Sequence, residues 1–156
     1  MKCAIDDTVE YVKFLAQRLG GCSPNCVVLV ILMDLGIPVN QDGFEYLKSA
    51  VLLQYEDPMR DLVNDIYPAI ASRYGNGAIS NKLLETSIRS AIRAAWLRTK
   101  IDVWQKYIPS LPKDYGHPPT STEVIASLAR IVELWKECSD AYMRQCNREV
   151  MHCGME

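Results

Sequence analysis

The sequence has little of what an enzyme needs. It contains only two histidines, His117 and His152, and both fall in segments expected to be loops, with no motif partner around either. It has no glycine-rich phosphate loop and no His-Glu-x-x-His run of the metalloprotease type. None of its cysteines stands in a motif that marks a nucleophile. We therefore expect a protein without catalytic activity.

The cysteines also lack the spacing of a metal site. Six occur, but there is no CxxC pair, and Cys22 and Cys26 are separated by Ser-Pro-Asn while Cys138, Cys146 and Cys153 lie far downstream beside a histidine. These spacings fit no common zinc module. The sequence predicts reduced thiols, several of them buried, and no metal or other cofactor.

No long hydrophobic run is present either. The longest, CVVLVILM over residues 26–33, is too short to span a bilayer and is typical of a buried helix. The start, MKCAIDDTVEY, has no apolar run behind a basic flank, so it does not look like a signal peptide. These absences predict a cytoplasmic protein with no membrane partner.

What the chain does have is helical periodicity along most of its length. Its 156 residues, 49% hydrophobic and 23% charged, are ordinary for one globular domain spanning 1–156. No segment predicts a strand. The expected fold is all-α, a six- to seven-helix bundle that contains a helix-turn-helix and no wing. The predicted helical segments are 6–19, 26–35, 41–54, 58–66, 68–74, 79–100, 102–107 and 120–148.

Several local signals set these boundaries. Asp57-Pro58 has the form of an N-cap followed by proline at the first helical position, with Met59, Leu62, Val63 and Ile66 as the buried stripe that follows. Thr120 and Glu123 have the spacing of a capping box. Residues 26–35 are apolar nearly all round, so we expect that helix to lie in the core.

The helix over 79–100 is strongly two-sided. On a wheel of about 100° per residue, its apolar and its basic residues occupy opposite faces. From Ile79 to Lys113 the charge is +5, and the rest of the chain then carries −7, because the total is −2. The apolar face holds Leu84, Ile88, Ala91, Ile92, Ala95 and Trp96, and the polar face holds Lys82, Thr86, Arg89, Arg93 and Lys100.

Such a helix is built like one that enters the DNA major groove. The short helix over 68–74 and the Gly75-Asn76-Gly77 turn precede it, which completes the parts of a helix-turn-helix. The alternative is the solvated surface of an ordinary core helix, and charge alone does not separate the two interpretations.

Residues 27–137 resemble the DNA-binding effector domain of the sporulation initiation response regulators, the stage 0 sporulation protein A family. The matches run in order and with similar spacing, and most of them are core or turn positions. They are Leu35-Gly36-Ile37-Pro38, Gly43, Tyr46-Leu47, Ala50, Tyr67-Pro68, Ile70-Ala71, Glu85, Ile88-Arg89, Ala91-Ile92, Ala95-Trp96, Pro119-Thr120, Glu123 and Ile125-Ala126.

The resemblance implies a six-helix domain whose helix-turn-helix is Pro68–Tyr74 and Ser80–Thr99. It also implies binding to double-stranded DNA as a tandem pair on repeated short boxes. The family presents Glu-Arg-Ala-Ile-Arg-His on its recognition helix, where this chain has Glu85-Thr86-Ser87-Ile88-Arg89-Ser90. Each lost bidentate arginine contact removes about 1–3 kcal/mol of base discrimination, so we expect a different DNA box.

These considerations give each residue of the candidate site a role. We expect Arg89 to read a base, unless it is only an exposed partner of Glu85, and Glu85 to orient Arg89 or accept from cytosine. Thr86 and Ser90 lie beside them. Thr120 and Ser121 stand at a helix N-terminus, a natural phosphate site, although capping alone explains Thr120 equally well. The expected phosphate contacts are Lys82, Arg93, Arg98 and Lys100.

The segments outside the resemblance, 1–25 and 138–156, are predicted helical extensions, and 1–25 is far too short for a receiver domain. They either cover the core or form a surface for a homodimer or protein partner, with Tyr142 and Met143 as apolar contacts. The predicted function is sequence-specific DNA-binding transcription regulation. The alternative is a protein-interaction module, an antagonist that kept the fold and lost sequence readout, and a third option is DNA bridging without sequence preference.

Overall fold

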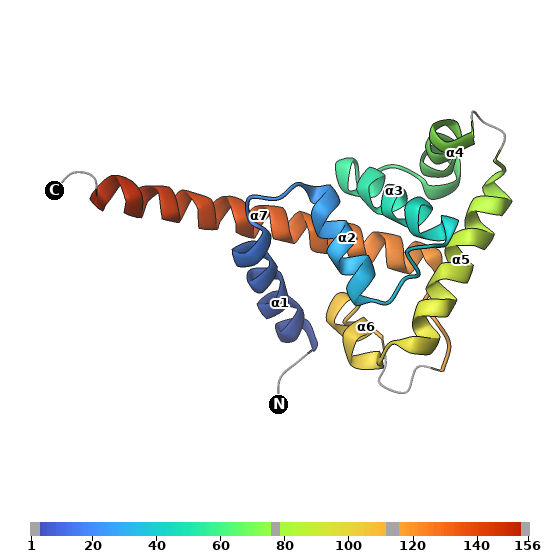
Figure 1. Ribbon diagram of the computed structural model, residues 1–156, viewed down its shortest axis with the longest axis horizontal. Coiled ribbons are helices and arrows are strands. Elements are labelled where there is room, and N and C mark those ends of the chain that lie inside the picture. Colours follow the sequence, from blue (N-terminus) through green and yellow to red (C-terminus); the bar gives the residue numbers. More distant parts are fainter. Residues whose placement is uncertain (1–3, 76–78, 112–115, 154–156) are drawn as a thin grey trace.

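The chain folds into α-helices and the loops between them (Figure 1). The computed structural model describes residues 4–75, 79–111 and 116–153. This part of the chain holds seven α-helices and one π-helical segment and no strand, which confirms the all-α prediction. The elements are α1 (Ala4–Leu19), α2 (Pro24–Asp34), α3 (Asp42–Glu56), η1 (Leu62–Ile66), α4 (Tyr67–Gly75), α5 (Asn81–Arg98), α6 (Ile101–Tyr107) and α7 (Ser121–Cys153).

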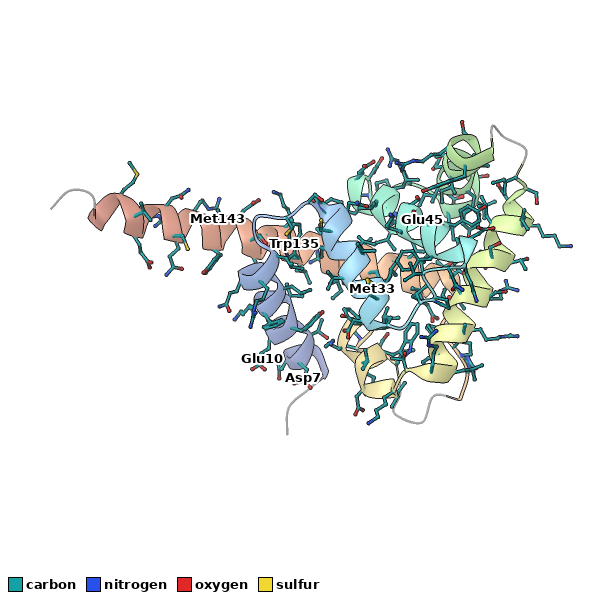
Figure 2. The ribbon with its side chains drawn as sticks, viewed as in Figure 1. Asp7, Glu10, Met33, Glu45, Trp135 and Met143 are labelled. Atoms are coloured by element: carbon teal, nitrogen blue, oxygen red, sulfur yellow. The ribbon has the colours of Figure 1, made fainter. Side chains whose placement is uncertain are left out.

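The longest element, α7, is the rod against which the others are arranged. It begins with the predicted capping box: Thr120 N donates to Glu123 Oε2 and Glu123 N donates to Thr120 Oγ1, both at 3.2 Å. Helices α1, α2 and α3 pack against it. Trp135 lies where α1 and α2 approach α7, whereas Met143 lies on the part that projects beyond the body (Figure 2). The first half of α7 is therefore core and the second half is largely free.

The turn after α2 needs its glycine. Gly36 has φ of 80°, a left-handed conformation that ends the helix. A β-carbon there would lie 2.5 Å from Thr99 Oγ1, which donates to Leu35 O at 2.8 Å. This bond joins the end of α5 to the end of α2.

The expectation that α2 would lie in the core is confirmed for one face of the helix only. Val27, Val28, Ile31 and Leu32 are buried, but the other face is solvent-exposed, with Met33 58% exposed. The cause is that α3 and α7 cover α2 from one side only. A sequence that is apolar on all faces of a helix is compatible with burial, but it does not indicate which face packs against other helices.

The expected helix start at Asp57-Pro58 was also wrong. Asp57 ends α3, and its side chain turns the chain by accepting from Met59 N at 3.0 Å. The next helical segment begins five residues later, at Leu62, and its N-cap is Asp61, whose Oδ2 accepts from Asn64 N at 2.9 Å. Met59 is 89% exposed and Val63 54% exposed, so neither belongs to a buried stripe. The segment then runs straight into α4, close to the start predicted at Pro68.

Four cysteine side chains fall within the described residues, and all four are free thiols. Cys22 and Cys26 are exposed, and Cys138 and Cys146 are half-buried. The expectation that several would be buried is wrong for these four, because each lies at a helix end or on a partly covered face. Within the described ranges, no helix combines the length and the apolar character needed to cross a membrane.

A cluster of polar aromatic side chains attaches α1 to the rest of the body. The Tyr107 hydroxyl of α6 donates to Asp34 Oδ2 at 2.5 Å and lies 2.7 Å from the Tyr11 hydroxyl of α1. Lys106 completes the cluster, with Nζ 2.9 Å from Asp34 Oδ2 and 4.1 Å from the centre of the Tyr11 ring. Burial, then the bonds to Asp34 and Tyr11, raise the pKa of Tyr107 far above its usual range.

Candidate nucleic-acid interface

The polar face of α5 points outward, as its sequence predicted. The helix begins at Ser80, whose Oγ accepts from Leu83 N at 3.1 Å. Its opposite face is buried through Leu84, Ile88, Ala91, Ile92 and Ala95. In Figure 1, α5 lies along the edge of the molecule farthest from the projecting end of α7. The exposed residues of this face are Lys82, Thr86, Arg89, Ser90 and Arg93.

The cations on and beside this face are free to meet an external partner. Lys82, Arg93, Arg98 and Lys100 are all exposed. None of the four forms an ion pair with another residue in the described ranges. Lys82, Arg93 and Arg98 lie on α5 and Lys100 lies just beyond its end, so the charge of all four is available for phosphate groups.

Arg89 forms an ion pair but remains accessible. Its Nη2 lies 3.2 Å from Glu85 Oε1, one turn earlier on the same helix, and its side chain is 66% exposed. An exposed i,i+4 pair of this kind is worth only about 0.3–0.5 kcal/mol, because water screens it. Most N–H donors of the Arg89 guanidinium therefore remain available to an external partner. The ion pair with Glu85 holds the side chain in one position before binding.

The Glu85 carboxylate is partly buried and forms hydrogen bonds to other helices that its sequence position does not predict. Its side chain is only 30% exposed, and it accepts from two hydroxyls besides Arg89. The Tyr67 hydroxyl of α4 donates to Oε2, and Ser121 Oγ at the start of α7 donates to Oε1 at 3.0 Å. Burial, then the bond to Glu85, raise the pKa of Tyr67 well above its usual range. One carboxylate thus joins three helices.

Thr120 and Ser121, the two residues at the start of α7 that were expected to bind phosphate, differ in their exposure to solvent. Thr120 is exposed, and its hydroxyl accepts from Glu123 N, so capping accounts for it. Ser121 was expected at the surface, but its side chain is buried, 5% exposed, because it turns inward to Glu85. Its hydroxyl is consequently not presented to solvent.

Thr86 and Ser90 lie at the junction of α5 and α3. The Thr86 hydroxyl donates to Lys82 O at 2.8 Å, which holds the side chain along the helix. Together with residues 40–42 before and at the start of α3, the two side chains line a polar hollow in the surface. No local pattern predicts this contribution of α3, since it depends on how two separate helices pack.

A family model described as Sporulation initiation factor Spo0A C terminal matches residues 28–132, which is most of the chain. The chain belongs to this family. The family is one of DNA-binding effector domains of a transcription factor, not of enzymes, so at the family level this is a DNA-binding regulatory protein connected with sporulation. No receiver domain is evident in the 156 residues. Helix α1 and nearly two thirds of α7, from Glu133 onward, lie outside the match.

Proposed function

We propose that the chain is a sequence-specific DNA-binding transcription regulator. In this proposal α4 and α5 form a helix-turn-helix, and residues Lys82–Arg93 of α5 enter the major groove. The observation that carries the proposal is the outward face of α5, where cations that form no ion pair with the described residues project from a helix whose reverse side is buried. A DNA partner also supports the expected cytoplasmic location, because that is where bacterial DNA lies.

The proposal assigns roles by position on α5. Arg89 reads a base edge, since it is mid-helix, exposed and able to donate to two acceptors at once. Lys82, Arg93, Arg98 and Lys100 contact phosphates, which position the helix without reading sequence. Thr86, Ser90 and Thr120 are secondary polar contacts. Ser121 is left out because its side chain is buried.

The DNA box is expected to differ from that of the family. Thr86 and Ser90 stand where the resemblance places an arginine and a histidine, so two donors that reach base edges are replaced by short hydroxyls. Hydroxyls contact several bases with little discrimination. We expect the chain to bind as a homodimer or as a tandem pair on repeated sites, which would restore affinity through a second set of contacts.

Selection from random DNA duplexes at a stated salt concentration tests the proposal. An enriched motif supports a regulator that reads sequence, and it also gives the duplex needed for measuring variants. Binding that is strongly salt-dependent but enriches no motif supports DNA bridging without sequence preference instead. A chain that binds no duplex at all refutes both.

A protein-interaction module is the second candidate, and the projecting half of α7 favours it. Tyr142 and Met143 are 40% and 43% exposed there, outside the family match, on the part of α7 that projects beyond the other described helices. Aromatic and methionine side chains are enriched in protein interfaces. If the selection enriches nothing, binding to a full-length regulator of the same family should be measured next.

A further inference from the structure

The carboxylate of Glu85 is already occupied before any ligand arrives. Three side chains donate to its two oxygens: Tyr67 from α4, Ser121 from α7 and Arg89 from α5 itself. Tyr67 is 2% exposed and Ser121 5% exposed, so the two hydroxyls have given up water for this contact. Buried hydroxyls need a partner, and among the described residues each finds it in Glu85.

This arrangement argues against Glu85 as a reader of bases. A carboxylate that reads cytosine must turn toward the groove and accept from the exocyclic amine. Turning Glu85 outward would leave the hydroxyls of Tyr67 and Ser121 buried without an acceptor, which is costly. The side chain is also less than one third exposed, compared with two thirds for Arg89.

The same arrangement gives Arg89 a defined starting position. Its guanidinium is drawn one turn toward the start of α5, where Glu85 is held by two other helices. A long side chain that is already ordered loses less conformational freedom when it binds. The order of Arg89 therefore depends on residues that are far from it in sequence and that are buried.

Building on the proposed function, we infer that Glu85 is a positioning residue. It joins α4, α5 and the start of α7, and it aims Arg89 at the DNA without reading a base itself. Tyr67 and Ser121 act through it, since they fix its two oxygens and contact no DNA themselves.

A double-mutant cycle on the enriched duplex tests this inference. We would measure Glu85→Gln, Arg89→Ala and the double variant on that duplex and on a scrambled duplex at one salt concentration. Glutamine keeps one oxygen that accepts from one buried hydroxyl, and its NH2 can donate to the other, but it loses the charge that holds Arg89. We expect Glu85→Gln to weaken specific binding about 3–10-fold and to have no further effect once Arg89 is alanine. Scrambled duplex should bind Glu85→Gln at least as well as the wild type, because a negative charge has been removed.

Ser121→Ala provides a second, independent variant. Because Ser121 is buried, its loss should weaken specific binding only through Glu85, in the same direction as Glu85→Gln and likewise without effect in an Arg89→Ala background. Glu133→Gln is the matched control, since it also removes one carboxylate that pairs with an arginine, Arg130 on α7. We expect no change in DNA binding for this control, and circular dichroism should show every variant folded.

Three outcomes would overturn one proposal or the other. If the losses of Glu85→Gln and Arg89→Ala multiply in the double variant, Glu85 makes its own contact and the inference is wrong. The same holds if Glu85→Gln changes the preferred base at a position that Arg89→Ala leaves unaltered. If the wild-type chain selects no duplex, the proposed function fails first, and that result is separate from either cycle outcome.

Discussion

A β-carbon on Gly43 would lie 2.3 Å from the carbonyl oxygen of Ser87, so α3 and α5 touch through their backbones at this point. The same atom would lie 2.9 Å from the β-carbon of Ala91. Both neighbours belong to the middle of α5, the stretch proposed to enter the groove. Gly43 therefore sets how closely the basic helix is held against the body, and it gives a direct way to disturb that distance.

We expect Gly43→Ala to destabilise the fold and to weaken DNA binding together. The added methyl meets backbone atoms that cannot rotate away, so α3 and α5 must separate. Overpacking of this kind costs about 1–3 kcal/mol of unfolding free energy, which outweighs a gain in helix propensity of at most about 1 kcal/mol. Urea denaturation measures the loss. Gly21→Ala is the control, because a β-carbon there has no atom within 4 Å. Equal stability of the two variants would contradict the close contact.

Arg89→Ala and Lys100→Ala are expected to change DNA affinity in different ways. Arg89→Ala should weaken binding to the enriched duplex by about 1–3 kcal/mol and leave scrambled duplex nearly unchanged, because it removes a base contact. Lys100→Ala should weaken both duplexes alike and reduce the salt slope by about one, because it removes a phosphate contact. Fluorescence titrations at several salt concentrations measure both effects. Equal losses on the two duplexes for Arg89→Ala would refute this division of roles.

The fold was predictable where a signal was long and local. The period of α5 and α7 extends over many residues, and each helix starts with a cap that its own neighbours complete, at Ser80 and at Thr120. Asp57 shows the limit of such reasoning. An aspartate before proline accepts a backbone N–H equally well in a helix cap and in a turn, so the local pattern around Asp57 does not distinguish the two. The exposure of one face of α2 could not be predicted from its sequence either, because it depends on which helices pack against α2.

The candidate site was predictable on one helix and not across helices. A helical wheel places Arg89 outward and four residues from Glu85, and the structure has that pair. The donors from Tyr67 and Ser121 come from 18 and 36 residues away in the sequence. Periodicity carries no information about such contacts, because they arise only when α4 and the start of α7 pack around α5.

The buried tyrosines Tyr67 and Tyr107 predict a loss of stability at alkaline pH. Burial and hydrogen bonds to carboxylates raise the pKa of both above the ordinary value in the folded state. Above about pH 10 the unfolded chain loses these protons while the folded chain keeps them, so unfolding becomes more favourable. Each tyrosine lowers the free energy of unfolding by up to about 1.4 kcal/mol per pH unit in this range, and it contributes no such slope below about pH 9. Urea denaturation from pH 8 to pH 11.5 measures it.

Tyr107→Phe isolates one of the two contributions. This variant loses the bond to Asp34, so it should be less stable than the wild type at pH 8. It has no phenol to titrate at this position, so its stability should fall less steeply above pH 10. Curves that remain parallel throughout would show that Tyr107 does not hold its proton in the folded state.

Ending the chain after Ala141 should leave the folded body intact. Beyond Ser139, which is 2% exposed, every described side chain of α7 is exposed except the half-buried Cys146, so little apolar surface is lost. We expect a change in unfolding free energy within about 1 kcal/mol, whereas Trp135→Ala, at a side chain 1% exposed, should cost about 3–5 kcal/mol. Thermal denaturation compares the two, and sedimentation of the shortened chain shows whether self-association depends on the removed part. If the shortened chain unfolds, the projecting half of α7 is needed to cover the core. If the full chain self-associates and the shortened chain stays folded but is monomeric, that half forms the surface through which two copies bind.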